Sequence, residues 1–424
     1  MSQKELSRAR ILALVAEGHV SLSEAAESMD VSERQARRLL DRFKEAGAAG
    51  LAHGNRGHPA PNRLAAKTRE RVLELVKKKY AGFNDTHLCE VLAEREKIVL
   101  GRETLRTLLR SEGMGPKRKR RVCQHRRRRD PRPCRGMMVQ WDGSWHPWLG
   151  PEHPKWTLMA AVDDADGKVE SAFFTTRETS AAYLRLLRGV LKRSGIPQSV
   201  YQDRHGALRR NDGYWSLEEQ LAGEQTPTQV GQALHDLGIK PIFARSAQGK
   251  GRIERFFGVA QDRLVAELGC RGIETMEEAN AYLSSGWLAD YNRRFGRAPR
   301  KPEIAYRGVR GLDLRQILSF RYTRTVSNDN VVVLGDVEIA IAPGPRRRSY
   351  AKARVDVRQH LDGSWSVYYQ DRRIAQHEAT VLSEPQRVRV RTRRSRPAKG
   401  ADEAVLVYFP ALDLDEETAA VAIG

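Results

Sequence analysis

Three carboxylates stand in sequence contexts that could bring them together at one site. Asp142 closes the apolar run GMMVQWD, Asp203 closes PQSVYQD, and Glu254 begins a helical pattern after a glycine-rich turn. Both aspartates are expected at the carboxyl ends of strands, where open α/β sheets commonly place their sites. Glu254 lies beside the apolar stripe of its helix, so it can lean over the sheet edge toward them. The three acids are therefore expected to converge from separate elements.

Converging carboxylates of this kind are suited to binding divalent metal ions. Mg²⁺ prefers oxygen ligands and keeps several of its waters, which leaves coordination positions for a phosphate. Two such ions, roughly 3.5–4 Å apart, stabilise the attacking and leaving oxygens when a phosphodiester is cut. Bound metal also offsets the repulsion among three acids. We therefore expect two Mg²⁺ ions per site, for which Mn²⁺ can substitute, held by Asp142, Asp203 and Glu254.

Other acids in the same region have simpler interpretations. Asp163 and Asp164 end a strand pattern and Asp166 lies in the following turn, so hairpin-turn carboxylates are favoured over metal ligands. Glu267 lies several helical turns beyond Glu254, away from the sheet edge. Glu254 alone would be interpreted as the ion-pair partner of a neighbouring arginine. The expected proximity of the two aspartates favours a metal-ligand role for Glu254.

The segment around Glu254, SAQGKGRIERFF, also carries basic residues. Lys250, Arg252 and Arg255 are expected to contact DNA phosphates near the reacting bond, and general solvation of exposed charge is the alternative. His146, which follows the first aspartate, could position a water or the nucleic acid. A structural histidine is the more common case at such a position.

The order of apolar segments predicts the fold that positions these acids. After the first strand, residues 155–176 predict a hairpin, residues 180–195 predict a helix, and further strand patterns alternate with helices. This order, β-ββ-α-β-α-β-α, indicates an α/β sandwich around a mixed sheet. We assign residues 136–300 to this core and expect its first and fourth strands to be neighbours. A polar stretch at about residues 205–227 is interpreted as a loop insertion.

Helical patterns at the N-terminus predict a helix-turn-helix unit in residues 1–50. Ser21 or Ser23 and then Ser32 are the expected N-caps of its second and third helices. A short helix, a tight turn and an arginine-rich helix are typical of DNA-binding proteins whose second helix of the pair enters the major groove. The residues that could reach bases or phosphates are Arg34, Gln35, Arg37 and Arg38. The alternative is a small helical bundle with solvated charges.

Four further segments complete the domain organisation. Residues 64–114 predict a second three-helix unit, which would make the N-terminal half a bipartite DNA reader. Residues 115–135 form a basic linker that is too charged to pack. Residues 318–380 show short alternating strands with an Asp-Gly turn signal and predict a small β-barrel. Residues 381–424 form a charged tail that we expect to be poorly ordered.

The bulk composition favours a nucleic-acid partner. The chain has 424 residues and a formal net charge of +21. A protein this basic usually meets a polyanion, because each neutralised phosphate releases counterions. The chain shows no apolar run of about 18 residues and no leader pattern, which disfavours a membrane partner. Its four cysteines lack the spacing of a zinc site, so reduced thiols are expected.

The chain resembles transposases and integrases that have a ribonuclease H-like core and an Asp-Asp-Glu triad, above all bacterial insertion-sequence transposases of the ISNCY kind. The resemblance covers most of residues 5–380 and is carried by VQWDGSWHPWLG, VYQDRHGALRRN and FARSAQGKGRIERFFGVAQDRLVAEL. It implies Asp142, Asp203 and Glu254 as the metal-binding catalytic triad. The interval from Asp203 to Glu254 is longer than in compact integrase cores, and the excess lies in the polar insertion.

The resemblance implies a DNA transposase whose helical N-terminus recognises the terminal inverted repeats of a mobile element. Its triad would activate water to nick a strand and then activate the 3′-hydroxyl to attack target DNA. Since two ends must be joined, we expect a homodimer or larger assembly on double-stranded DNA, in the bacterial cytoplasm at the nucleoid. The alternatives are a non-catalytic DNA-binding regulator with a decayed core and a nuclease or resolvase. Three intact acids argue against the regulator, and paired readers argue against the nuclease.

Overall fold

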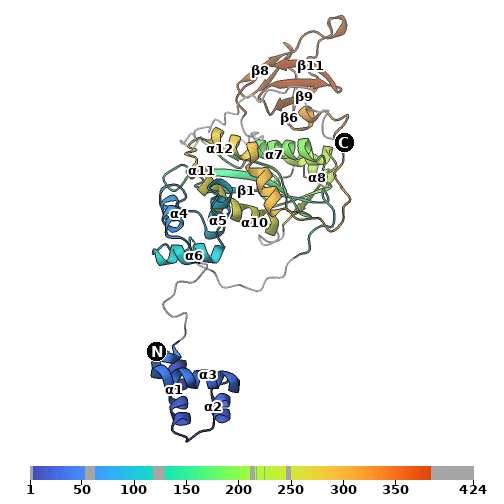
Figure 1. Cartoon of the computed structure of the whole chain (residues 1–424). Helices are drawn as coiled ribbons and strands as arrows, with labels where there is room; N and C mark the ends of the chain where they lie inside the picture. Colours follow the sequence, from blue (N-terminus) through green and yellow to red (C-terminus); the bar gives the residue numbers. More distant parts are fainter. Residues whose placement is uncertain are drawn as a thin grey trace, which may run out of the picture. The chain divides into compact units, whose positions relative to one another are not determined.

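The chain divides into two compact units, Met1–Glu74 and Leu75–Gly424, each with its own buried core. The computed structural model describes residues 3–52, 63–117, 129–210, 215, 217–223, 225–244 and 250–382 of the sequence. Figure 1 shows the helices and strands and labels many of those described below.

The first unit begins with a helix-turn-helix arrangement, as predicted. Its helices are α1 (Gln3–Ala16), α2 (Leu22–Ser28) and α3 (Glu33–Ala46), and a 3₁₀ turn (Gly47–Leu51) follows. Ser21 and Ser32 cap α2 and α3 by accepting backbone N–H hydrogen bonds, so both N-caps are confirmed. Asp30 takes a φ of 52° in the turn between α2 and α3. The small core consists of Leu12, Ala25, Ala26, Met29, Ala36, Leu39 and Leu51.

Three more helices occupy the positions expected for the second helical segment. Helix α4 (Ala66–Lys78) runs across the boundary of the two units, and α5 (Asp85–Arg95) and α6 (Arg102–Ser111) follow. Asn84 caps α5 by accepting a 2.8 Å hydrogen bond from the His87 backbone N–H. Helices α5 and α6 pack through buried Leu88, Leu92, Leu105, Leu108 and Leu109. Whether this segment reads DNA stays a prediction.

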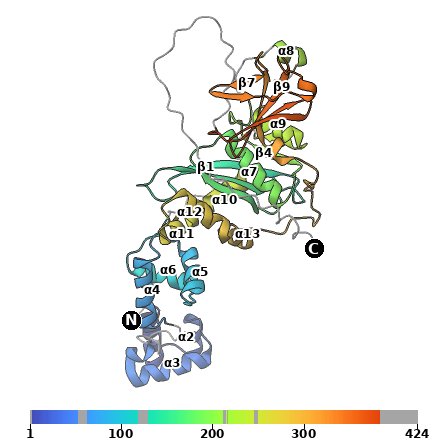
Figure 2. The ribbon, with the colours of Figure 1, turned by 90° about the horizontal axis from the view of Figure 1, so that it is seen from above.

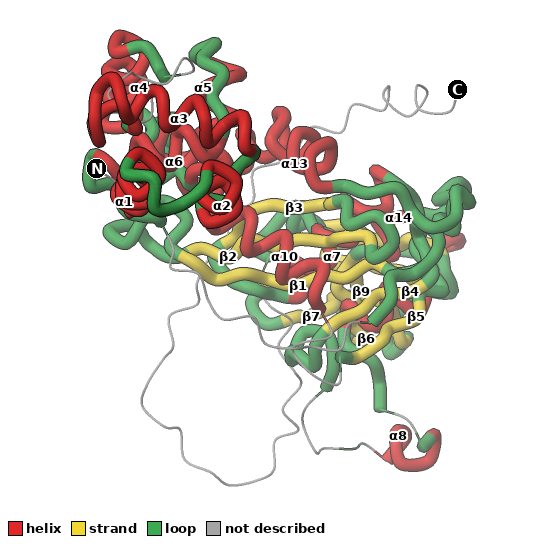
Figure 3. Tube along the Cα trace, turned by 60° about the horizontal axis from the view of Figure 1, so that its bottom comes forward, coloured by secondary structure: helices red, strands yellow, loops and turns green. Residues whose placement is uncertain are grey.

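A five-stranded mixed sheet forms the centre of the second unit, as expected from the order of apolar segments. Its strands are β1 (Val139–His146), β2 (Trp156–Asp163), β3 (Val169–Thr175), β4 (Ser199–Gln202) and β5 (Lys240–Phe243). They lie in the order β3-β2-β1-β4-β5, drawn in yellow in Figure 3. Strands β1, β2 and β3 are antiparallel neighbours, whereas β4 runs parallel to β1 and β5 parallel to β4. The expected pairing of the first and fourth strands is confirmed.

Alternate residues of the strands face two different helical layers. Trp141, Met159 and Ala161 pack toward α7 (Ser180–Arg193) and α9 (Gln229–Asp236). Leu158 and Ala160 pack toward the other layer, which Figure 2 shows on the opposite side of the sheet. That layer consists of α10 (Gly251–Val259), a π-helical turn (Ala260–Leu264), α11 (Val265–Cys270), α12 (Met276–Tyr282), a second π-helical turn (Leu283–Trp287) and α13 (Leu288–Phe295). The sheet is therefore buried on both faces.

The prediction that Asp142 closes the first strand is wrong. Strand β1 continues to His146 and stays paired with β2 as far as Trp156. The polar sequence Asp-Gly-Ser after Trp141 resembles a turn, but the antiparallel partner supplies the ladder that keeps it extended. Asp142 therefore lies within the strand, whereas Asp203 follows the last residue of β4 as expected.

The hairpin acids are structural, as favoured above. Asp163 accepts hydrogen bonds from the Gly136 backbone N–H and from Tyr306, and Asp164 pairs with Arg129 at 2.5 Å. Asp166 pairs with Arg135 at 2.9 Å. Residues 129–135 of the basic linker thus pack against the core, contrary to the expectation for this part. Residues 118–128 of the linker lie outside the described residues.

Helix α5 is tied to the core by charged side chains. Arg263 pairs with Glu90 at 2.5 Å, and Arg95 pairs with Glu267 at 2.7 Å. Glu267 also lies 3.0 Å from the His87 ring nitrogen Nε2. These contacts join α5 to the π-helical turn and to α11, the two elements that follow α10 in the chain. In the polar insertion the structure describes α8 (Leu217–Ala222), while 211–214, 216 and 224 lie outside the described residues.

The C-terminal strands share one core but their closure into a barrel stays a prediction. After α14 (Leu314–Ile317), a four-stranded sheet has the order β11-β10-β9-β6, and β7 pairs with β8. The strands are β6 (Ser319–Thr325), β7 (Val331–Leu334), β8 (Val337–Ala340), β9 (Arg354–His360), β10 (Trp365–Tyr369) and β11 (Arg372–His377), with a 3₁₀ turn (Pro345–Arg347) between β8 and β9. Gly363, with φ 84°, forms the predicted Asp-Gly turn between β9 and β10. Residues 383–424 of the charged tail lie outside the described residues.

Among the described residues, Cys89, Cys134 and Cys270 are free thiols, and Cys123 lies outside these residues. Within the described ranges, no helix combines the length and the apolar character that crossing a membrane requires.

Candidate active site

Asp142 and Asp203 lie side by side because their strands are parallel neighbours. The register pairs Val139 with Val200 and Gln140 with Tyr201. Two residues further along each segment, Asp142 lies opposite Asp203. One carboxylate oxygen of each aspartate, together with one of Glu178, lies within 4.8 Å of the others. The predicted meeting of the two aspartates is therefore present, with a third acid that the sequence reasoning missed.

The Lys250 ammonium lies between the two aspartates. Its Nζ is 3.1 Å from Asp142 Oδ2 and 3.3 Å from Asp203 Oδ2. The lysine side chain is only 7% exposed, so its charge depends on these two partners for stabilisation. The site thus accommodates a cation between its carboxylates.

Burial shapes the acidity of the Asp142 carboxyl. Removal from water raises its pKa to about 6, and the Lys250 charge and hydrogen bond act in the opposite direction. The neighbouring Glu178 and Asp203 charges add to the increase. Two acids held this close favour a cation of higher charge than one ammonium.

Glu178 enters from the segment between β3 and α7. It precedes Thr179, which caps α7 by accepting a 3.1 Å hydrogen bond from the Ala182 backbone N–H. The Tyr183 hydroxyl donates a hydrogen bond to Glu178 Oε1, and His205 Nδ1 lies 4.0 Å from the same oxygen. Its other oxygen lies over Gly143 of β1. The one local signal for it was an acid directly before a helix N-cap, which is common in proteins and points to no particular site.

Glu254 is exposed in the first turn of α10 and is not among the three clustered acids of the described residues. Helix α10 and the π-helical turn after it lie along β1. The Ile253 backbone N–H of α10 donates to Gln140 Oε1 at 3.4 Å, and Gln261 of the turn donates to Ser144 at 3.2 Å. Residues 245–249, which lead into α10, are outside the described residues. The predicted role of Glu254 as third ligand is therefore untested.

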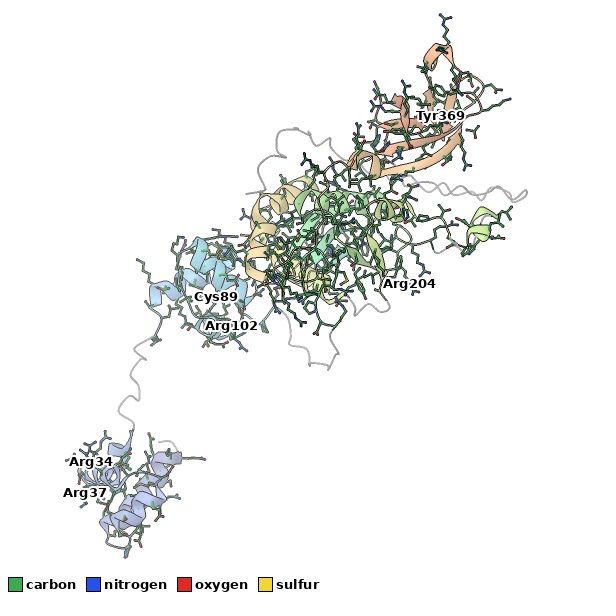
Figure 4. The ribbon with its side chains drawn as sticks, turned by 90° about the vertical axis from the view of Figure 1, so that its right-hand side faces the viewer. Arg34, Arg37, Cys89, Arg102, Arg204 and Tyr369 are labelled. Carbon is green, nitrogen blue, oxygen red and sulfur yellow. The ribbon has the colours of Figure 1, made fainter. Side chains whose placement is uncertain are left out.

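The predicted DNA contacts next to the site have different surroundings. Lys250 is buried between the aspartates, Arg252 is half-buried and Arg255 is exposed. On α3, all four candidates are exposed: Arg34, Gln35, Arg37 and Arg38. Figure 4 labels Arg34 and Arg37 among the side chains of this helix. Contact of these residues with DNA stays a prediction.

Comparison with known families supports the helix-turn-helix assignment. Residues 8–70 match the family described as winged helix-turn helix. This match begins in α1, includes α2 and α3, and ends within α4.

Two curated relatives extend over most of the chain. A protein of Sinorhizobium fredii described as transposase y4bF is 32% identical over 398 residues, which is 90% of this chain and 84% of that protein. The transposase for insertion sequence IS1202 of Streptococcus pneumoniae is 30% identical over 329 residues, which is 69% of this chain and 68% of that protein. The chain belongs to the insertion-sequence transposase family. In this transposase, the shared region includes the sheet that carries Asp142 and Asp203, since 90% of the chain is covered.

Two solved viral structures, an intasome and an integrase core domain, are also similar to this chain. A simian T-cell lymphotropic virus intasome in complex with the PP2A regulatory subunit B56 gamma is 15% identical, with a TM-score of 0.30, over 73% of this chain and 99% of that chain. The HTLV-2 integrase catalytic core domain in complex with magnesium, in its trimeric form, is 18% identical, with a TM-score of 0.25, over 35% of this chain and 82% of that chain.

Proposed function

We propose that the chain is a DNA transposase that cuts and joins DNA strands by a metal-dependent reaction at Asp142, Asp203 and Glu254. The observation that supports this most is the meeting of Asp142 and Asp203 on adjacent parallel strands around the Lys250 ammonium. Membership of the transposase family supplies the class of reaction.

The donor set fits divalent metal ions. Carboxylate oxygens within 4.8 Å of one another are the hard ligands that Mg²⁺ and Mn²⁺ prefer, and a cation already lies between the aspartates. Two Mg²⁺ ions held there would supply stabilisation of the attacking and leaving oxygens of the phosphodiester. Asp142 and Asp203 would hold them with Glu254, which lies one helical turn after Lys250 on α10.

The chain's own groups would bring DNA to these acids. The exposed residues of α3 would read the terminal inverted repeat in the major groove, with α4, α5 and α6 as a second reader. Arg252 and Arg255, on either side of Glu254, would hold the backbone near the reacting bond. The net charge of +21 also supports DNA, a polyanion, as the partner.

The reaction also implies an assembly. Joining both ends of an element to one target requires two sites, so we infer a homodimer or larger complex on double-stranded DNA. It would act in the bacterial cytoplasm, where the nucleoid provides the terminal repeats and the target.

The test is a strand-transfer assay with the full-length protein. A labelled duplex ending in the element's own terminal repeat is incubated with a target plasmid and Mg²⁺, and a duplex with a scrambled repeat is the control. Transposition predicts a nick at the repeat end followed by covalent joining of that strand to the plasmid. Cleavage without joining would instead favour a nuclease or resolvase. Specific binding without cleavage in any divalent metal would favour a DNA-binding regulator.

A further inference from the structure

Glu178 faces the two aspartates from an element that the predicted triad does not use. One of its carboxylate oxygens lies within 4.8 Å of oxygens of Asp142 and Asp203. We propose that Glu178 is an additional metal-ligating carboxylate of this site, and that Gly143 and Tyr183 position it. The inference rests on the proposed metal-dependent function and adds a ligand from the start of α7.

Gly143 leaves the space in which the Glu178 carboxylate lies. A Cβ atom at position 143 would be 2.8 Å from Glu178 Oε2 and 2.9 Å from Thr157 Cγ2. Real Cβ atoms essentially never approach so closely, so any larger residue would push the carboxylate away from β1. Glycine is unfavourable within a strand, and it often marks a close approach of another group. Here the group that approaches Gly143 is the carboxylate of Glu178, and the neighbouring residue in the strand is Asp142.

Tyr183 fixes the other oxygen of Glu178. Its hydroxyl donates to Oε1, and its ring is fully buried against Trp141 with 5.4 Å between centroids. A tyrosine hydroxyl carries one proton to donate, and a carboxylate oxygen can only accept, so Tyr183 is the donor of this hydrogen bond. A hydrogen bond to one oxygen orients the carboxylate, while Oε2 lies against Gly143. Metal-ligating carboxylates are commonly held in this way.

The charges around the site also favour a cation of charge two. Three carboxylates surround the position, and the Lys250 ammonium is paired with Asp142 and Asp203. Glu178 therefore adds a negative charge beyond the two that share the lysine. A site with such an excess of oxygen ligands and negative charge suits Mg²⁺ or Mn²⁺. The competing interpretation is that Glu178 only anchors Tyr183 and the start of α7.

Metal binding by the full-length protein without DNA separates these interpretations. Mn²⁺ is titrated into wild type, Glu178→Gln, Tyr183→Phe, Asp142→Asn and the control Glu277→Gln, and bound metal is measured by calorimetry. Glu277 is an exposed residue of α12 and has the same charge change. Glu178→Gln removes a ligand and is expected to weaken Mn²⁺ binding on the order of tenfold or more. Tyr183→Phe removes only the hydrogen bond that orients Glu178 and is expected to weaken Mn²⁺ binding on the order of several-fold. The control should bind as wild type does.

The outcomes distinguish this inference from the proposed function. If Glu178→Gln binds Mn²⁺ like wild type while Asp142→Asn does not, Glu178 is not a ligand and only this inference fails. If wild type and Asp142→Asn bind Mn²⁺ equally weakly, the metal-dependent function itself is contradicted. Thermal unfolding without metal checks that each variant is folded. Should Glu178→Gln not fold, Glu178→Asp keeps the charge but withdraws it by one methylene, and unchanged Mn²⁺ affinity there would overturn the inference.

Discussion

Lys250 Nζ lies 3.1 Å from Asp142 Oδ2, so the helix that carries Glu254 begins with a cation held by the first aspartate of the site. The lysine is four residues before Glu254 and stands at the N-cap of α10. A divalent ion bound by the aspartates must compete with this ammonium. Lys250 could then reach a DNA phosphate, which is the role the sequence predicts for it.

Replacing Lys250 by methionine should raise the affinity for Mn²⁺ and lower the stability of the metal-free protein. The two aspartates would lose their shared counterion, so we expect the free energy of unfolding to fall by about 1–2 kcal/mol. This is less than the loss expected on breaking a fully buried ion pair, because the Asp203 side chain is 43% exposed. Calorimetric Mn²⁺ titration and thermal unfolding in chelator measure the two effects. Lys240→Met, at an exposed lysine of β5, is the matched control. Weaker Mn²⁺ binding by Lys250→Met would contradict competition.

The ion pairs of Glu267 should make the second unit sensitive to acid. Burial alone would raise the pKa of Glu267, but hydrogen bonds from His87 and Arg95 outweigh it and lower the pKa to about 2. Because this pKa lies below the ordinary 4.5, the stabilisation is present above pH 4.5 and is lost as the pH falls toward 2. Glu267→Gln should destabilise the unit by about 3 kcal/mol at pH 7.

Urea unfolding of wild type and Glu267→Gln between pH 7 and pH 3 checks this expectation. The difference between the two proteins should shrink as the pH falls below 4.5. A difference that stays constant over this range would show that packing, and not charge, is what the substitution removes.

Arg34 and Arg38 should contribute to binding of the terminal repeat. Both are exposed on α3. Removing one arginine that contacts a phosphate should reduce the magnitude of the slope of log affinity against log salt concentration by about 1. Fluorescence anisotropy of the labelled repeat over a series of salt concentrations measures the slope for Arg34→Ala and Arg38→Ala. Arg10→Ala, on the exposed surface of α1, removes the same charge from the same unit. Equal losses for all three variants would mean that only net charge matters.

Gly189 should tolerate no side chain, because α7 lies too close to β3 at this point. A Cβ at position 189 would lie 2.1 Å from Ser171 Oγ. Gly189→Ala is expected to destabilise the protein by about 1–3 kcal/mol through overpacking. In Gly269→Ala the new methyl meets no atom within 4 Å on α11, so the higher helix propensity of alanine should leave stability unchanged or slightly higher. Thermal unfolding compares the pair, and equal melting temperatures would refute the close approach of α7.

The sequence was sufficient for the elements that depend on local periodicity. Apolar runs located all five strands of the mixed sheet. The expected pairing of the first and fourth strands accounts for the meeting of Asp142, within β1, and Asp203, which follows β4. The helix caps Ser21 and Ser32 were also predictable, because a cap bonds a backbone group only three residues away.

The features that were missed depend on groups distant in sequence. Glu178 reaches the site because β1 carries Gly143 and because the sheet brings the end of β3 close to it. Lys250 resembles a surface base until two aspartates from other strands bury its ammonium. Strand β1 runs past Asp142 because β2 pairs with it, which overrides the turn-like composition Asp-Gly-Ser. None of these contacts leaves a local pattern.

The most direct test of the catalytic assignment is the rate of strand cleavage by Glu254→Gln at the element's terminal repeat in Mg²⁺, compared with wild type and with the control Glu277→Gln. The substitution keeps the size of the side chain and removes only the anionic oxygen that a metal would bind. If Glu254 is a metal ligand, the cleavage rate should fall by about a hundredfold or more while binding of the repeat is unchanged. Mutating a group that only orients a metal ligand already lowers metal affinity or activity by roughly ten- to hundredfold. Cleavage by Glu254→Gln at the rate of Glu277→Gln would contradict the triad.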